Sequence, residues 1–261
     1  MGSAVLDGLI ASGHEPHLIS ATTRTEVSAK HFRDRGLSAL AVETAQDANA
    51  LLAADADLIV LGVKPYQITE VLEELRGEIG KNAVVISMAA GITLETMSSV
   101  LPDNPNIIRT MPNTPALVGN GVTGLAAAQS ASREAVSAAI ALFEKVGSVI
   151  EVSENQINSL SAISGSGPAW VFYFIEQWEA IAQQEGFTKE QAEVLVRETF
   201  AGSLKLLSES DETPSQLRKK VTSPGGTTER IIATFDEASL KSIFEAGLKA
   251  AVARAEEIAK G

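Results

Sequence analysis

The segment V-T-S-P-G-G-T-T at residues 221–228 combines residue types that bind a small anion. It offers hydroxyl groups and side-chain-free backbone N–H groups at Ser223, Thr227, Thr228, Gly225 and Gly226. The residues that follow have helical character, so the segment is predicted to open a helix, whose free N–H groups and positive dipole end attract a carboxylate. A plain turn before a helix is the alternative, since Gly, Pro and Ser also dominate turns for backbone reasons.

Composition narrows the class of protein. The 261 residues suffice for two domains, and 45% hydrophobic with 21% charged residues is typical of a globular protein. The 33 acidic residues outnumber the 21 basic ones, which gives a net charge of −12. This balance argues against a surface that binds nucleic acid or an anionic membrane.

Metal, disulfide and thiolate chemistry find no support in the sequence. There is no cysteine, and the three histidines (His14, His17 and His31) lack metal-ligand spacing, so no metal is expected. The uncharged stretches 110–132 and 155–175 carry many polar residues, so they are not predicted to span a membrane. The first residues show no signal-peptide pattern, and we therefore expect a cytoplasmic protein.

Residues 1–153 alternate β-rich runs with helical patterns, which predicts a dinucleotide-binding domain of the α/β, Rossmann-like class with a parallel sheet. The predicted strands are 17–20, 38–42, 58–63, 83–88, 107–111, 122–126 and 148–152. The predicted helices lie near 24–35, 45–54, 67–79, 94–100 and 132–145.

Residues 154–261 change character, because strand-like runs vanish and helical periodicity takes over. This predicts an all-α second domain. Its stretch Ala169–Gln184 is apolar nearly all round, as in a helix buried in a core or at a subunit interface. We interpret this domain as one that binds substrate and forms a homodimer, although a self-contained helical bundle would give a similar pattern.

The start of the chain resembles the end of a dinucleotide-binding fingerprint. Gly2 and Ser3 open a helical pattern, as the last glycine of G-x-G-x-x-G does, which predicts contact with the cofactor. The first strand and the two earlier glycines of such a fingerprint are apparently missing from the sequence. In the alternative interpretation, Met1 simply opens an ordinary helix.

The end of the first predicted strand suggests which nucleotide binds. An NAD site usually has an acidic residue here, whereas this chain has Thr22, Thr23 and Arg24. A guanidinium beside hydroxyls suits a 2′-phosphate, so NADP(H) is favoured, with NAD(H) as the second choice. A surface arginine in a polar turn is the alternative.

Three consecutive strand ends carry small, polar or proline-rich turns, at 61–65, 87–92 and 109–115. Ligands of open α/β sheets bind at the carboxyl ends of strands, so these turns predict a cleft. Ala90, Gly91 and Asn113 are predicted to line it beside the cofactor.

With these motifs, the chain resembles the pyrroline-5-carboxylate reductase family over its whole length. The matching segments are G-S-A at 2–4, V-K-P at 63–65, A-A-G-I at 89–92, M-P-N-T-P at 111–115, S-G-S-G-P-A at 164–169 and V-T-S-P-G-G-T-T at 221–228. The last segment, followed by a helix, is the most specific of them.

The resemblance implies NAD(P)H-dependent reduction of 1-pyrroline-5-carboxylate to L-proline, the last step of proline biosynthesis. It also implies a helical domain that interlocks with a partner subunit, and dimers that commonly assemble into decamers. By matching position, the cofactor site would be lined by Asn49, Val63, Lys64, Pro65 and Ala89.

The resemblance also assigns the substrate site. Ser223 and the amides of Gly226 and Thr227, with Gly225 beside them, would hold the substrate carboxylate, and Thr228 would face the ring nitrogen. An imine nitrogen gains a proton readily, so a site of hydroxyls and amides suffices, and Thr228 would orient the ring as the catalytic residue.

Two other functions compete with this hypothesis. Another two-domain NADP-dependent reductase of small carboxylates would share the nucleotide half, but the helix near Pro168 carries no lysine before Lys189 to serve as its catalytic group. A non-catalytic NADP(H)-sensing dimer would need no carboxylate cradle. Asp211 is a candidate proton donor, with a solvated acidic run as its plainer interpretation.

Overall fold

The computed structural model describes residues 1–260, which divide by internal packing into two units. The first unit comprises Met1–Ser166 together with the end of the chain from Ala251, and the second comprises Gly167–Ala250. The domain boundary after residue 153 stays a prediction, because internal packing and sequence character divide a chain by different criteria.

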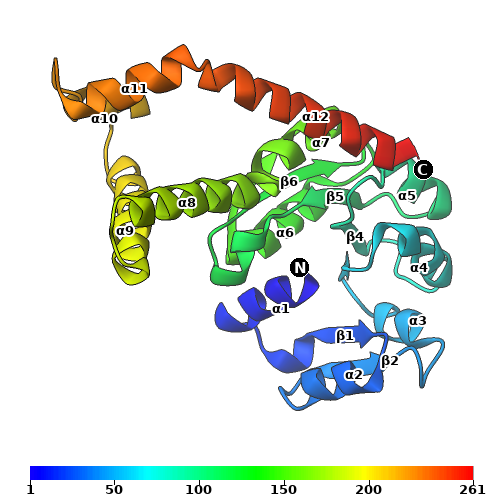
Figure 1. Cartoon of the computed structure of the whole chain (residues 1–261). Coiled ribbons are helices and arrows are strands. Elements are labelled where there is room, and N and C mark those ends of the chain that lie inside the picture. Colours follow the sequence, from blue (N-terminus) through cyan, green and yellow to red (C-terminus); the bar gives the residue numbers. More distant parts are fainter. Residues whose placement is uncertain (261) are drawn as a thin grey trace. The chain divides into compact units, whose positions relative to one another are not determined.

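The strands formed by residues 1–260 lie in the first unit and make two separate sheets (Figure 1). They are β1 (Ser20–Thr23), β2 (Ser38–Ala41), β3 (Leu58–Leu61), β4 (Val84–Ser87), β5 (Ile107–Met111), β6 (Gly121–Ala127) and β7 (Gly147–Glu151). The larger sheet has the order β3-β4-β5-β6-β7, and β1 pairs only with β2. All neighbours run parallel except β5 and β6.

Helices cover both faces of the larger sheet, because strand residues alternate between two apolar clusters. The helices of this unit are α1 (Gly2–Ala11), α2 (Glu26–Arg33), α3 (Ala48–Ala53), α4 (Ile68–Leu75), α5 (Leu94–Val100), α6 (Arg133–Phe143) and α7 (Ile157–Leu160). Val85 and Ile107 pack with α3, α4, α5 and α7 on one face, whereas Val84, Ile86 and Ile108 pack with α1 and α6 on the other.

Hydroxyl side chains fix where three of these helices begin. Thr25, Thr93 and Ser132 each accept a hydrogen bond from the backbone N–H three residues later, at the starts of α2, α5 and α6. Each such cap is worth about 1 kcal/mol, because it satisfies an N–H group that has no partner inside the helix. The caps therefore set the lengths of the turns between the strand ends and the helices.

The predicted Rossmann-like arrangement is confirmed, with two local differences. The strand expected at 17–20 is wrong: Pro16–Leu18 forms the 3₁₀ turn η1, and β1 begins at Ser20. Pro16 fixes the backbone angle of the turn, whereas the β-branched Thr22 and Thr23 favour extended chain. The strand β6 is antiparallel to β5, because the short η3 turn (Thr114–Val118) replaces a crossover helix between them.

The second unit is entirely helical, as predicted. Its helices are α8 (Gly167–Gln184), α9 (Lys189–Ser208), α10 (Pro214–Lys220), α11 (Thr227–Glu237) and the start of α12 (Leu240–Lys260). Phe174 of α8 contacts Trp170 and, on α12, Phe244, with ring centroids 6.2 and 5.9 Å apart. Few residues of this unit are buried, and Phe172 and Tyr173 are 64% and 57% exposed. The unit by itself thus leaves much of its apolar surface in contact with water.

Candidate active site

The loop before α11 has the geometry of an anion cradle. Gly225 adopts a left-handed backbone conformation with φ of 72°, and Gly226 is the residue that precedes the first turn of the helix. The Gly226 N–H donates to the Ser223 carbonyl at 3.0 Å, which closes the turn. A Cβ added at Gly226 would lie 3.0 Å from that same carbonyl oxygen, so a side chain there would press against the turn.

The start of α11 leaves N–H groups without helical partners. No side chain caps this helix, and the N–H groups of Thr227 and Thr228 in its first turn lie where an α-helix supplies no acceptor. Together with the positive end of the helix dipole, they suit a carboxylate. Ser223 and Thr228 lie in the same short segment as these amides, and their assignment to the substrate stays a prediction.

One contact of this loop was missed by sequence reasoning. The Glu229 carboxylate accepts a hydrogen bond from the Gly225 N–H at 2.8 Å. Glu229 lies three residues after Gly226, which is the spacing of a capping box. That spacing is a signal that could have predicted a carboxylate turned back on this loop.

The nucleotide half brings the beginning of α1 against the end of β3. The position of a Cβ added at Gly62 lies 3.5 Å from the Gly2 Cα atom, so the two backbones lie close together and present no side chains to each other. The free N–H groups at the start of α1 lie in this region, which suits a phosphate group. The predicted cofactor residues Gly2 and Ser3 thereby lie close to the segment that continues into Val63.

The turns after β3 and β4 lie at the same edge of the sheet, because these strands are parallel and in register. Lys64 opens the η2 turn (Pro65–Gln67), where its N–H donates to the Gln67 side chain at 3.3 Å. Ala89 is buried and donates its N–H to the Ser87 hydroxyl at 3.2 Å. Ala90 and Gly91 follow directly, so the chain presents little side-chain bulk at this edge.

Thr22 and Thr23 end β1, and Arg24 lies in the short turn between β1 and α2. Arg24 is exposed, and the Thr23 hydroxyl donates to the Thr25 carbonyl at 2.9 Å. A carboxylate also lies here, because Glu43 accepts a hydrogen bond from the Glu26 N–H at the start of α2. Sequence reasoning missed it, since the pairing of β1 with β2 brings together residues 17 positions apart.

Two asparagines predicted to contact the cofactor make bonds within the protein. The Asn49 amide on α3 donates to the Glu74 carboxylate on α4 at 2.7 Å. Asn113 is 8% exposed, donates to the Ser164 carbonyl at 3.0 Å and accepts from the Val122 N–H at 2.8 Å. Asn113 thus ties the turn after β5 to the beginning of β6 and to the π-helical turn η6 (Ser161–Gly165).

A buried ion pair supports the same region. Arg109 on β5 has a side chain that is 5% exposed, and it donates to the Glu154 carboxylate at 3.1 Å and to the Asn158 side chain at 3.4 Å. The same Glu154 oxygen accepts from the Leu94 N–H at 2.7 Å, at the beginning of α5. The Arg109 Nε atom has no hydrogen-bond partner within residues 1–260. Sequence reasoning did not identify this pair.

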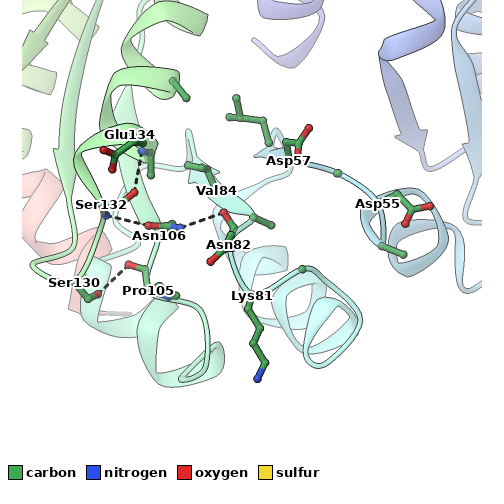
Figure 2. A pocket seen from close by; sticks show the side chains of 17 residues that line it. Asp55, Asp57, Lys81, Asn82, Val84, Pro105, Asn106, Ser130, Ser132 and Glu134 are labelled. Carbon is green, nitrogen blue, oxygen red and sulfur yellow. Dashed lines mark hydrogen bonds between the residues drawn. The ribbon is translucent and has the colours of Figure 1, made fainter.

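A hollow of about 710 Å³ lies at the opposite edge of the sheet (Figure 2). It is formed where the chain enters β3, β4 and β5, and Asn106 bridges the Asn82 carbonyl and the Ser132 N–H there. Because ligands of open α/β sheets bind at the carboxyl ends of strands, this hollow is not the candidate site. Within the described residues, no group of acidic or histidine side chains is placed to hold a metal, and no helix has the length and apolarity to cross a membrane.

Comparisons with known proteins agree with this arrangement. Residues 154–258 match the family described as pyrroline-5-carboxylate reductase dimerisation, and residues 1–91 match NADP oxidoreductase, coenzyme F420-dependent. A pyrroline-5-carboxylate reductase from Vibrio alginolyticus is 38% identical over 100% of this chain and 94% of its own length.

Solved structures extend the similarity to the fold. A pyrroline-5-carboxylate reductase from Coxiella burnetii has a TM-score of 0.91 at 38% identity, covering 100% of this chain and 95% of its own. The pyrroline carboxylate reductase of Plasmodium falciparum with NADP bound has a TM-score of 0.85 at 26% identity, covering 99% and 94%. Similarity of this extent along the whole sequence shows that the chain belongs to the pyrroline-5-carboxylate reductase family.

Proposed function

We propose that the protein reduces 1-pyrroline-5-carboxylate to L-proline with a reduced nicotinamide cofactor, the last step of proline biosynthesis. The observation that carries this proposal is the full-length similarity to reductases of that substrate, which includes the cradle before α11. We assign the reaction to the cytoplasm, where NADPH is kept reduced.

The substrate carboxylate is assigned to the first turn of α11. The Thr227 and Thr228 N–H groups and the Ser223 hydroxyl supply hydrogen-bond donors there, and Gly225 and Gly226 shape the turn. Such donors bind an anion without a lysine or arginine, because the helix dipole adds positive potential. The substrate is thereby held by the carboxylate that its five-membered ring carries.

Thr228 is assigned to the ring nitrogen. A protonated imine is already electron-poor at carbon, so the protein needs to orient the ring and does not need a strong acid. The Thr228 hydroxyl can accept a hydrogen bond from the iminium N–H and later donate one to the product amine.

The cofactor is assigned to the first unit, with NADP(H) preferred and NAD(H) as an alternative. NADPH, when bound, supplies the hydride. Gly2 and Gly62 add no side-chain bulk at the start of α1, which favours a pyrophosphate there, and Thr22, Thr23 and Arg24 offer donors to a 2′-phosphate. The Plasmodium relative with NADP bound supports the same class of cofactor. Asn49, Val63, Lys64, Pro65, Ala89, Ala90, Gly91 and Asn113 would complete the site or its supports.

A homodimer is proposed for the second unit, whose sequence matches a dimerisation family. Its helices expose large apolar side chains such as Trp170, Phe172, Leu204 and Ile243, and a second copy would cover them. Assembly of such dimers into a decamer is the larger form that the family resemblance implies. Sedimentation velocity distinguishes monomer, dimer and decamer.

The decisive experiment follows the loss of NADPH absorbance when 1-pyrroline-5-carboxylate is added to the purified protein. We expect turnover with this imine and none with 2-ketoacids of similar size, and the product should be identified as L-proline. Turnover of the ketoacids alone would instead favour a hydroxyacid dehydrogenase. Binding of NADPH without turnover of either class would favour a non-catalytic sensor.

A further inference from the structure

Glu229 occupies part of the loop that the proposed function assigns to the substrate carboxylate. Its carboxylate accepts from the Gly225 N–H at 2.8 Å, and its side chain is exposed to solvent. The contact joins residues four positions apart, across the beginning of α11. A protein carboxylate therefore already binds one of the loop's backbone donors.

The remaining donors of the loop are few. The Gly226 N–H is used in the turn, where it donates to the Ser223 carbonyl at 3.0 Å. Hydrogen bonds to an incoming anion are therefore left to the Ser223 hydroxyl and to the first-turn amides of α11, beginning with Thr227.

The charge of Glu229 acts in the same place as its hydrogen bond. The positive end of a helix dipole is felt within the first turn, and Glu229 is the third residue of α11. Its negative charge partly neutralises that potential and repels a second carboxylate. A neutral ligand would not experience this repulsion.

We propose that Glu229 is an internal competitor of the substrate carboxylate, which lowers the affinity of the site for carboxylate ligands. This inference rests on the proposed function, because it takes the loop at 223–228 as the substrate site. Glu229 sets how much substrate is needed for half-maximal rate, and it does not take part in the transfer of hydride or proton. It is therefore a residue that tunes affinity.

The test compares Glu229→Gln and Glu229→Ala with the wild-type protein. Glutamine keeps an oxygen that can accept from the Gly225 N–H but removes the charge, whereas alanine removes both. Glu237→Gln, at the other end of the same helix, is the matched control, because it removes one exposed negative charge from the chain without touching the loop. Circular dichroism melting confirms that each variant is folded.

Two readouts are measured. The KM for 1-pyrroline-5-carboxylate should fall about two- to fivefold in both Glu229 variants, the range for a charge at an exposed helix N-terminus. The Kd for L-proline, measured by calorimetric titration, should fall by a similar factor. The KM for NADPH should stay within about twofold, and Glu237→Gln should match the wild type.

The outcomes separate the two proposals. If the wild type reduces the imine but the Glu229 variants have an unchanged or a higher KM and Kd, the competitor role is wrong and the proposed function stands. A higher KM would show that Glu229 instead holds the loop ready for substrate. A wild-type protein that neither turns over the imine nor binds L-proline would overturn both proposals.

Discussion

The buried pair of Arg109 and Glu154 allows a quantitative test of what supports the strand ends. Glu154→Gln removes the carboxylate charge but keeps an oxygen for the Leu94 N–H, and Arg109→Met removes the guanidinium while filling a similar volume. The two single variants and the double variant form a double-mutant cycle. The cycle isolates the ion pair from the cap that Glu154 gives to α5.

The two single changes should have unequal costs. Glu154→Gln leaves a cation that is 5% exposed without its opposite charge, with only neutral oxygen acceptors beside it, so the free energy of unfolding should fall by about 3 kcal/mol. Arg109→Met leaves a carboxylate that is 33% exposed, that water can reach and that still caps α5, and this should cost about 1 kcal/mol. The double variant should be no worse than Arg109→Met, which gives a coupling of about 3 kcal/mol.

Differential scanning calorimetry measures these changes in the first unit. Tryptophan fluorescence would not, because both tryptophans, Trp170 and Trp178, lie in the second unit. Glu154→Gln should lower the unfolding midpoint by about 6–12 °C. Glu151→Gln, which breaks the exposed pair with Arg133, is the control and should cost less than about 1 kcal/mol. Single-variant effects that add within about 0.5 kcal/mol in the double variant would refute the reasoning.

Three further predictions concern the site. Asn113→Asp keeps the oxygen that accepts from the Val122 N–H but sets a carboxylate oxygen against the Ser164 carbonyl. The free energy of unfolding of the first unit, measured in urea, should therefore fall by about 2–3 kcal/mol. Asn120→Asp, exposed in the same turn, should cost under about 0.5 kcal/mol, and equal losses in the two variants would show that the bonds of Asn113 to Ser164 and Val122 do not stabilise this turn. Thr228→Ala should lower kcat about 10- to 100-fold and leave the KM for NADPH unchanged. Thr228→Ser should restore kcat, because it keeps the hydroxyl group. An unchanged kcat in Thr228→Ala would show that Thr228 has no part in the mechanism. Arg24→Ala should raise the KM for NADPH about tenfold and leave the KM for NADH nearly unchanged, whereas equal changes would show that Arg24 does not bind the 2′-phosphate.

Local patterns predicted most of the fold because the apolar residues of this sequence clearly follow either the period of a helix or that of a strand. The apolar run from Leu58 to Leu61 forms β3, and the residues that follow Thr93 and Ser132 form α5 and α6 behind their caps. The first strand was misplaced because Leu18 and Ile19 have strand-like side chains while Pro16 imposes a turn. The direction of β6 was missed because an antiparallel partner differs from a parallel one in connection length and not in residue type.

The candidate site was predicted only where its residues follow one another in the chain. The cradle at 223–228 is such a segment, and its backbone geometry follows from its own glycines. The partners of Asn113, at Val122 and Ser164, depend on how β5, β6 and the π-helical turn pack together, and no local pattern encodes that packing. Glu229 lies between these cases, since its spacing was visible but the atom that it binds was not.

The sparse interior of Gly167–Ala250 has a consequence for how the protein responds to dilution. Because little apolar surface leaves water within a single copy, the stability of these helices would come mainly from association. Folding and association would then form one equilibrium, in which each tenfold dilution of the chain removes about 1.4 kcal/mol of stability per dimer. A cell that makes less of this protein would lose more than a proportional share of its catalytic capacity, because a larger fraction of the chains would be unfolded.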